Sequence, residues 1–150
     1  MGDRVINMDE AVQFQYQING EDFTSAGKAS VQVKKMLRQL GLDAETIRRV
    51  SVAMYEGEIN MVIHADGGSA EVLVCDEFVR VILADKGPGI PDVALAMQEG
   101  FSTAKDNIRS LGFGAGMGLP NMRRYSDDMR IDTVVGEGTT VTMDFDIPNK

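Results

Sequence analysis

Apolar and polar residues alternate strictly near the start of the chain. Val12, Phe14, Tyr16 and Ile18 are separated by three glutamines, and a period of two places all four on one face of a β-strand. Asn19-Gly20 is a turn signal that ends this strand. Residues 1–10, which precede it, are polar and are expected to form a loose lead-in.

Apolar residues then recur three and four positions apart, which is the spacing of amphipathic helices. The first helix is expected to run to about Leu40, with Thr24 or Ser25 as its N-cap and Gly41 as its stop. A second, long helix is predicted from Asp43 to Asp66-Gly67-Gly68. The apolar positions that define the two helices are Ala29, Val33, Met36, Leu37 and Leu40, and Ile47, Val50, Met54, Met61 and Ala65.

The rest of the chain contains two predicted β-hairpins. One joins residues 70–74 to 78–84, and the other joins 129–135 to 139–147 through Gly136-Glu137-Gly138. The intervening stretch, 85–118, is rich in glycine and holds a short helix near 93–98; a further helix covers 119–125. This order predicts a single two-layer α/β sandwich with a mixed, mostly antiparallel sheet and helices on one face.

Composition narrows the functional classes. The 150 residues carry 15 basic and 23 acidic side chains, a net charge of −8, which argues against a nucleic-acid partner. One cysteine and one histidine exclude a disulfide framework and a multi-histidine metal site within the chain. With neither a long apolar run nor a signal-peptide core, we expect a cytoplasmic protein without a membrane partner.

A first polar cluster lies on the second predicted helix. Glu56, Asn60 and His64 are each four residues apart and share one side of that helix, whereas Glu58 points to the other side. A carboxylate one turn before a carboxamide offers a base and an oxygen ligand suited to Mg²⁺. The alternative is a solvated stripe on an amphipathic helix. We prefer Glu56 as the functional acid and His64 as a structural residue.

Two glycine-rich clusters follow. Asp85-Lys86-Gly87-Pro88-Gly89-Ile90 comes directly after a strand, where the carboxylate can accept a hydrogen bond from an exocyclic amine and the glycines allow a flat ligand to approach; a plain Gly-Pro turn is the alternative. Gly112, Gly114, Gly116 and Gly118 alternate before a helix, an arrangement that offers backbone N–H groups to an anion. The alternative for this stretch is a flexible surface loop without a ligand.

Together these clusters resemble the GHKL ATPase family, named for gyrase, Hsp90, histidine kinases and MutL. The resemblance covers about residues 12–147. Glu56–Asn60 resembles the family's N box, residues 85–89 its first glycine box, 112–118 its second, and Gly138-Thr139-Thr140-Val141 its Gly-Thr strand. It implies the Bergerat-type ATP-binding fold, with residues 91–118 as a glycine-rich ATP lid.

The resemblance also implies roles for individual residues. Glu56 would be the general base, Asn60 the Mg²⁺ ligand and Asp85 the acceptor for the adenine amine. Lys105 and Arg109, in the lid, would be candidates for contact with the γ-phosphate. The remaining residues implied at the nucleotide are Gly87, Gly89, Ile90, Gly114, Gly116, Gly118, Leu119, Thr139 and Val141.

Within that family the chain is most similar to bacterial anti-sigma factors that are also serine kinases, and to related switch kinases. This implies transfer of the ATP γ-phosphate to a serine of a STAS-type antagonist protein, binding of a sigma factor, and a homodimer. Two alternatives stay open: an ATP-binding domain that acts in trans with a histidine phosphotransfer partner, and a non-catalytic binding module tuned by nucleotide.

Overall fold

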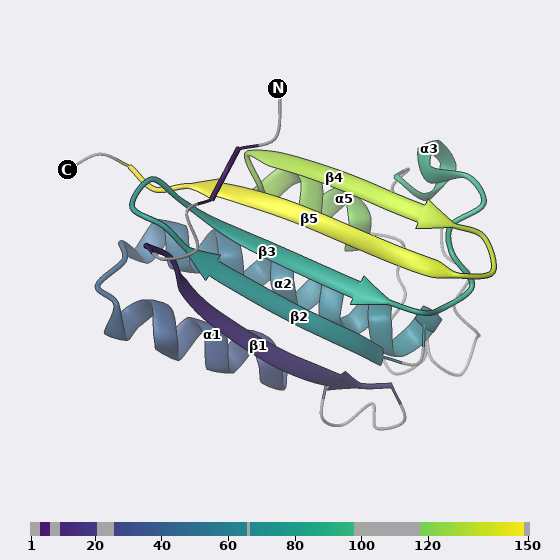
Figure 1. Cartoon of the computed structure of the whole chain (residues 1–150), viewed down its shortest axis with the longest axis horizontal. Helices are drawn as coiled ribbons and strands as arrows, with labels where there is room; N and C mark the ends of the chain where they lie inside the picture. The colour runs from purple at the N-terminus through teal and green to yellow at the C-terminus, as the bar shows by residue number, and fades with distance from the viewer. Residues whose placement is uncertain (1–3, 7–9, 21–25, 66, 98–117, 149–150) are drawn as a thin grey trace.

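One antiparallel sheet organises the molecule. The computed structural model describes residues 4–6, 10–20, 26–65, 67–97 and 118–148. Across these residues the strand order is β1-β2-β3-β5-β4, and each neighbouring pair is antiparallel (Figure 1). The strands are β1 (Val12–Asn19), β2 (Gly67–Val74), β3 (Phe78–Asp85), β4 (Asp128–Val134) and β5 (Gly138–Asp146).

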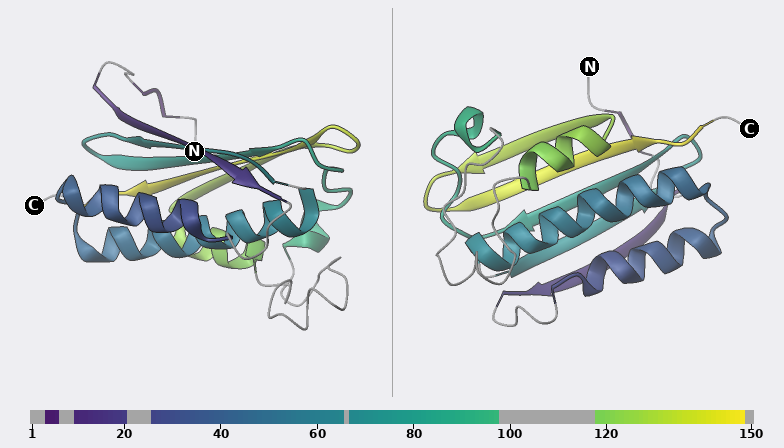
Figure 2. Two further views of the ribbon diagram at one scale, coloured as in Figure 1. Left: turned by 90° about the horizontal axis from the view of Figure 1, so that it is seen from below. Right: turned by 180° about the vertical axis from the view of Figure 1, so that it is seen from behind.

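Three helices cover one face of this sheet, as Figure 2 shows from two sides. They are α1 (Lys28–Gln39), α2 (Ala44–Ala65) and α5 (Gly118–Tyr125), while the short α3 (Val93–Ala96) lies beside the β4–β5 hairpin. The predicted two-layer α/β sandwich is therefore confirmed.

The hydrophobic core lies between the two layers. Alternate residues of the strands and the inner stripes of the helices meet there, as the sequence periods predicted. Its most deeply buried side chains are Val33, Leu37, Val50, Met54, Val72, Val79, Val81, Met122, Met143 and Phe145. In β1, by contrast, only Ile18 of the four alternating apolar residues is fully buried, because β1 is an edge strand.

The two long helices begin in different ways. The side chain of Asp43 caps α2 by accepting the Thr46 N–H at 3.0 Å, as the sequence indicated. Thr24 and Ser25, the expected caps of α1, lie outside the described residues, and the cap position itself belongs to Gly27, with a φ of 99°. A glycine has no side chain that could serve as a cap.

Glu58 of α2 supplies what Gly27 lacks. Its side chain is only 2% exposed and accepts the backbone N–H groups of Gly27, Ala29 and Ser30 at 2.7, 3.2 and 3.1 Å. These are donors that the first turn of a helix leaves without an intrahelical partner. A buried carboxylate on one helix thus caps the next helix and joins the two.

Gly57 lets α2 pack closely against its neighbours. A Cβ atom at this position would lie 2.1 Å from Cδ1 of Leu83 in β3 and 3.1 Å from Cε of Met122 in α5. Glycine is a poor interior helix residue, so its presence in α2 is explained by this contact with the sheet and with α5.

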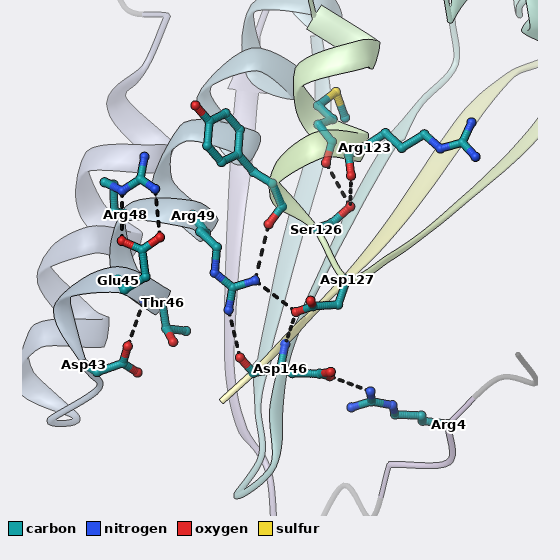
Figure 3. A network of polar contacts seen from close by, with 12 residues as sticks. Arg4, Asp43, Glu45, Thr46, Arg48, Arg49, Arg123, Ser126, Asp127 and Asp146 are labelled. Carbon is teal, nitrogen blue, oxygen red and sulfur yellow. Dashed lines mark hydrogen bonds and ion pairs between the residues drawn. The ribbon is translucent and has the colours of Figure 1, made fainter. Parts of the chain in front are cut away.

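Arg49 joins the ends of three elements in the network of Figure 3. Its guanidinium donates to the carbonyl oxygens of Tyr125 and Asp146, at 3.5 and 2.9 Å, and to the carboxylate of Asp127 at 2.9 Å. Asp127 also accepts the N–H of Asp146 at 2.6 Å. Arg4 extends the network by pairing with the Asp146 carboxylate.

Candidate functional site

The polar residues of α2 meet α5 at one end of the sandwich. Glu56 and Asn60 are both half-buried. Asn121 of α5 donates its side-chain N–H to Oε1 of Glu56 at 3.4 Å, and Nδ2 of Asn60 lies 3.9 Å from the sulfur of Met122. The same side of α2 therefore presents a carboxylate and a carboxamide oxygen next to the first turns of α5.

Gly118, the first residue of α5, lies directly against Asn60. A Cβ atom at Gly118 would be 2.7 Å from Nδ2 and 2.8 Å from Oδ1 of that side chain. Only glycine allows the start of the helix to approach Asn60 this closely. The last glycine of the 112–118 run is thus in contact with the polar cluster of α2.

Asp85 forms the second part of the site, at the end of β3. Its Oδ1 accepts two backbone N–H groups, from Gly87 at 2.9 Å and from Thr139 of β5 at 3.2 Å. Oδ2 has no hydrogen-bond partner among the described residues. One oxygen is therefore committed to holding the loop, and the other remains an acceptor for a ligand.

The loop after Asp85 packs against both α2 and the β4–β5 hairpin. A Cβ atom at Gly87 would lie 2.6 Å from Cβ of Ala65, at the end of α2. Gly89 has a φ of 78°, and a Cβ atom there would lie 2.6 Å from the carbonyl oxygen of Val134. The loop thus connects Asp85 to the helix that carries Glu56 and Asn60.

Thr133 and Thr139 fix the hairpin side of the site. They are paired across β4 and β5, and their hydroxyl oxygens are 2.9 Å apart. Thr133 Oγ1 also accepts the N–H of Ile90 at 2.9 Å and lies 3.2 Å from the carbonyl oxygen of Gly138. Val141, two residues beyond Thr139, is buried in the core.

His64 is the third residue of the polar stripe that Glu56 and Asn60 begin on α2. It is half-buried one turn beyond Asn60, and burial lowers the pKa of its imidazole. The neutral ring is therefore favoured at physiological pH, and the structural role of His64 stays a prediction.

The structure brings the described members of the predicted site to one end of the sandwich. Glu56 and Asn60 come from α2, Asp85, Gly87, Gly89 and Ile90 from the end of β3 and its loop, Gly118 and Leu119 from α5, and Thr139 and Val141 from β5. The other predicted residues, Lys105, Arg109, Gly112, Gly114 and Gly116, lie outside the described residues.

Sequence reasoning missed two residues of this region, Thr133 and Asn121. Thr133 looks like an ordinary β-branched residue of a strand, and Asn121 like a polar residue near a helix start. The sequence carries no local signal for either, because their partners, Thr139 and Glu56, are defined only by strand pairing and helix packing.

The donor set at Asn60 fits a hard divalent cation. Carboxamide and carboxylate oxygens are ligands that Mg²⁺ accepts, and this ion commonly keeps waters and binds substrate phosphates instead of filling an all-protein cage. The described residues contain no group of three or more His, Cys, Asp and Glu that could hold a metal ion. None of the described helices is long and apolar enough to span a bilayer.

Comparison with known sequences gives consistent matches. The family described as "Histidine kinase-like ATPase domain" matches residues 21–145. The serine/threonine-protein kinase RsbT of Bacillus subtilis (strain 168) is 31% identical over 112 residues, covering 72% of this chain and 78% of the relative. The anti-sigma F factor of Caldanaerobacter subterraneus is 30% identical over 120 residues, covering 77% and 80%.

Solved structures share the fold at lower identity. A crystal structure of the RsbU and RsbW domains of a Mycobacterium tuberculosis protein matches 93% of this chain with a TM-score of 0.64 and 18% identity. The chain corresponds to 33% of the length of that structure. A mycobacterial sensor histidine kinase, MprB, matches 93% of this chain and all of that structure, with a TM-score of 0.53 and 16% identity.

Proposed function

Because this chain belongs to the histidine kinase-like ATPase family, we propose that it is an ATP-dependent serine/threonine kinase of the anti-sigma type. Its substrate would be a serine of a STAS-type antagonist protein, and its regulatory target a sigma factor. The relatives named as a serine/threonine kinase and as anti-sigma F factors support this assignment.

One observation carries the nucleotide part of the proposal: the arrangement of the Asp85 carboxylate. The N–H groups of Gly87 and Thr139 hold Oδ1 in place, so Oδ2 is presented in a fixed direction. A fixed acceptor at a strand end, beside glycines that permit close approach, suits the exocyclic amine of adenine. Ile90 and Val141 would contact the base, and Gly118 and Leu119 would lie toward the phosphates.

At the other end of the site, Glu56 would act as the general base. It would accept the proton of the substrate serine as the seryl oxygen bonds to the γ-phosphorus and the bond from that phosphorus to the β–γ bridging oxygen breaks, releasing ADP. Asn121 contacts Glu56 from α5 and would help to orient it.

Asn60 would hold Mg²⁺ through its side-chain oxygen. When bound, the ion would neutralise charge on the phosphates. The contact of Nδ2 with Met122 would leave Oδ1 as the atom for the ion. We further propose that residues 91–118 form the ATP lid, in which Lys105, Arg109, Gly114 and Gly116 would approach the phosphates.

The test is phosphoryl transfer to a purified STAS-type protein encoded near this gene. The protein is incubated with γ-labelled ATP and Mg²⁺, and the label is characterised by acid stability and by mass spectrometry. We expect acid-stable phosphoserine on the antagonist. Glu56→Gln should lower the rate at least a hundredfold, which lies within the range for loss of a general base, with nucleotide affinity nearly unchanged.

The matched control is Glu45→Gln, an exposed glutamate in the first turn of the same helix, which should transfer phosphate at the wild-type rate. Acid-labile phosphohistidine on a phosphotransfer partner would replace the proposal with the histidine-kinase alternative. ATP binding without transfer to any antagonist, together with normal signalling by Glu56→Gln in cells, would favour the non-catalytic module. Sedimentation of the same sample tests the proposed homodimer.

A further inference from the structure

The solvent side of α1 is basic, in contrast to the rest of the chain. The helix contains neither Asp nor Glu, whereas acidic residues outnumber basic ones by 23 to 15 in the whole chain. Its basic side chains, all of them exposed, are Lys28, Lys34, Lys35 and Arg38. More than a quarter of the positive charge is thus gathered on one helix of 12 residues.

Helix geometry places three of these cations in one line. Lys28, Lys35 and Arg38 lie on it together with Val31, and successive members are three, four and three residues apart. Side chains at this spacing share one face of a helix. We call these four residues the basic stripe, which is about 15 Å long at 1.5 Å per residue. Val31, between the first two cations, is 52% exposed.

The stability of the fold does not explain the basic stripe. No ion pair or hydrogen bond joins its charged side chains to any other residue in the described ranges. Lys28 lies in the first turn, where the helix dipole disfavours a cation, and Lys35 and Arg38 repel each other three residues apart. Elsewhere the described structure pairs five arginines with carboxylates, namely Arg4, Arg48, Arg49, Arg80 and Arg130.

The position of α1 leaves this face open. Figure 2 shows α1 at the margin of the helical layer, with α2 on one side of it and the edge strand β1 beside it. We propose that the basic stripe is a docking surface for an acidic amphipathic helix of a partner protein. Carboxylates of the partner would face the three cations, and one of its apolar side chains would cover Val31.

Charge and shape favour such a helix over other anionic partners. The stripe follows about three turns of α1, so a partner helix lying alongside it can present acidic residues with the same spacing. A nucleic acid would instead meet a molecule with a net charge of −8, and its binding depends on many cations that neutralise phosphates. The exposed valine between the cations also fits an apolar side chain of a protein.

The test uses a fluorescein-labelled, alanine-rich helical peptide of about 18 residues, with glutamates spaced to face the three cations and a leucine to face Val31. Fluorescence anisotropy with the full chain should show saturable binding that weakens as salt screens the charges. Reversal of all three cations, in Lys28→Glu/Lys35→Glu/Arg38→Glu, should weaken binding about thirtyfold, since three exposed pairs are each worth about threefold. The same peptide with lysines in place of its glutamates should bind this triple variant and not the wild type.

Arg130→Glu is the matched control for Lys35→Glu. Arg130 is exposed on β4, at the opposite edge of the sheet from β1, and pairs with Asp132. Its reversal should leave the affinity for the acidic peptide unchanged, whereas Lys35→Glu should lower that affinity about threefold. Equal affinity of the wild type and the triple variant, no saturable binding by the wild type, or tighter binding of a short DNA duplex than of the peptide would overturn the inference.

Urea denaturation separates docking from stability. Because the stripe makes no described ion pair, the triple variant should unfold at the same urea concentration as the wild type, and a clearly lower midpoint would overturn the inference. If the variant does not fold, the wild type decides by its preference for the acidic peptide over one with glutamines in place of the glutamates. The binding measurement needs no nucleotide, so a failure to bind ATP would refute the proposed function and leave this test intact.

Discussion

At the scale of single residues, Glu56 and Glu58 show how helix geometry separates two identical side chains. Two positions apart on α2, they point in nearly opposite directions. Glu56 faces α5 and Asn121, whereas Glu58 is buried against the start of α1. The helical period alone assigned Glu56 to the functional side. It could not assign a role to Glu58, because the first turn of α1 is its partner only after folding.

We predict that Glu58→Ala strongly destabilises the fold. Hydrogen bonds to a buried charged group are worth about 1.5–3 kcal/mol each in stability, and unpaired buried donors carry their own cost. With three N–H groups left without an acceptor, we expect a loss of about 3 kcal/mol or more in the free energy of unfolding, measured by urea denaturation.

Glu45→Ala is the control for this measurement. Glu45 is exposed and pairs with Arg48 three residues away, so its loss should change the free energy of unfolding far less than the loss of Glu58. If Glu58→Ala were no more destabilising than Glu45→Ala, the capping role of Glu58 would be wrong.

At the scale of elements, features that depend on neighbours in sequence were predictable, whereas features that depend on a residue of another element were not. The capping of α2 by Asp43 and the turn at Gly41 depend on neighbours in sequence, so both were predicted. Gly57 reads as a weak point of a helix, and only the approach of Leu83 explains it. Thr133 is likewise unremarkable until β4 pairs with β5.

Two adjacent arginines of α2 provide a matched test of how elements are joined. Arg49 bonds the ends of α5 and β5, and its side chain is 20% exposed; Arg48, at 53%, pairs with Glu45 and lies over the ring of Tyr125. We expect Arg49→Ala to lose about 2 kcal/mol of stability and Arg48→Ala to lose much less.

Urea denaturation of both variants measures the difference in stability. The slope of the unfolding free energy against urea concentration should be the same in the two variants. Equal losses in the two arginine variants would mean that the Arg49 contacts in Figure 3 contribute no more than a surface ion pair.

At the scale of the whole molecule, the fold class followed from the sequence but the order of strands did not. Two hairpins and three helices can be combined in several antiparallel sheets with the same periodicity. The structure selects the order in which β5 lies between β3 and β4, and that choice places Thr139 beside Asp85. Candidate site residues could be proposed on each element from the sequence, whereas their register across elements could not.

The acid stability of the whole protein should depend on Asp127. Burial alone would raise the pKa of this carboxyl, but the Asp146 N–H and the Arg49 guanidinium outweigh it and hold the pKa below its ordinary value. Because the pKa is lowered in the folded state, the carboxylate stabilises the fold at pH values above its pKa in the unfolded chain, which is about 3.9. That contribution is lost as the pH falls through the folded value.

We therefore expect wild type to be more stable than Asp127→Asn at pH 7, with the difference in unfolding free energy shrinking as the pH drops below about 4. Denaturation series at several pH values measure it. Arg49→Ala removes the guanidinium that helps to lower the pKa of Asp127. In that background, the difference in unfolding free energy between Asp and Asn at position 127 should depend less on pH. Parallel curves for wild type and Asp127→Asn would contradict this account.

The central place of β5 also bears on how the chain acquires its shape during synthesis. Residues 138–146 leave the ribosome after the other four described strands, yet they lie between β3 and β4 and pair with both. Until they emerge, β3 presents an unpaired edge, and such edges invite non-native pairing. Asp85 likewise lacks the N–H of Thr139 until then. A nascent chain halted before residue 138 would therefore be unable to assemble the adenine end of the site, so nucleotide binding would report that synthesis has passed this strand.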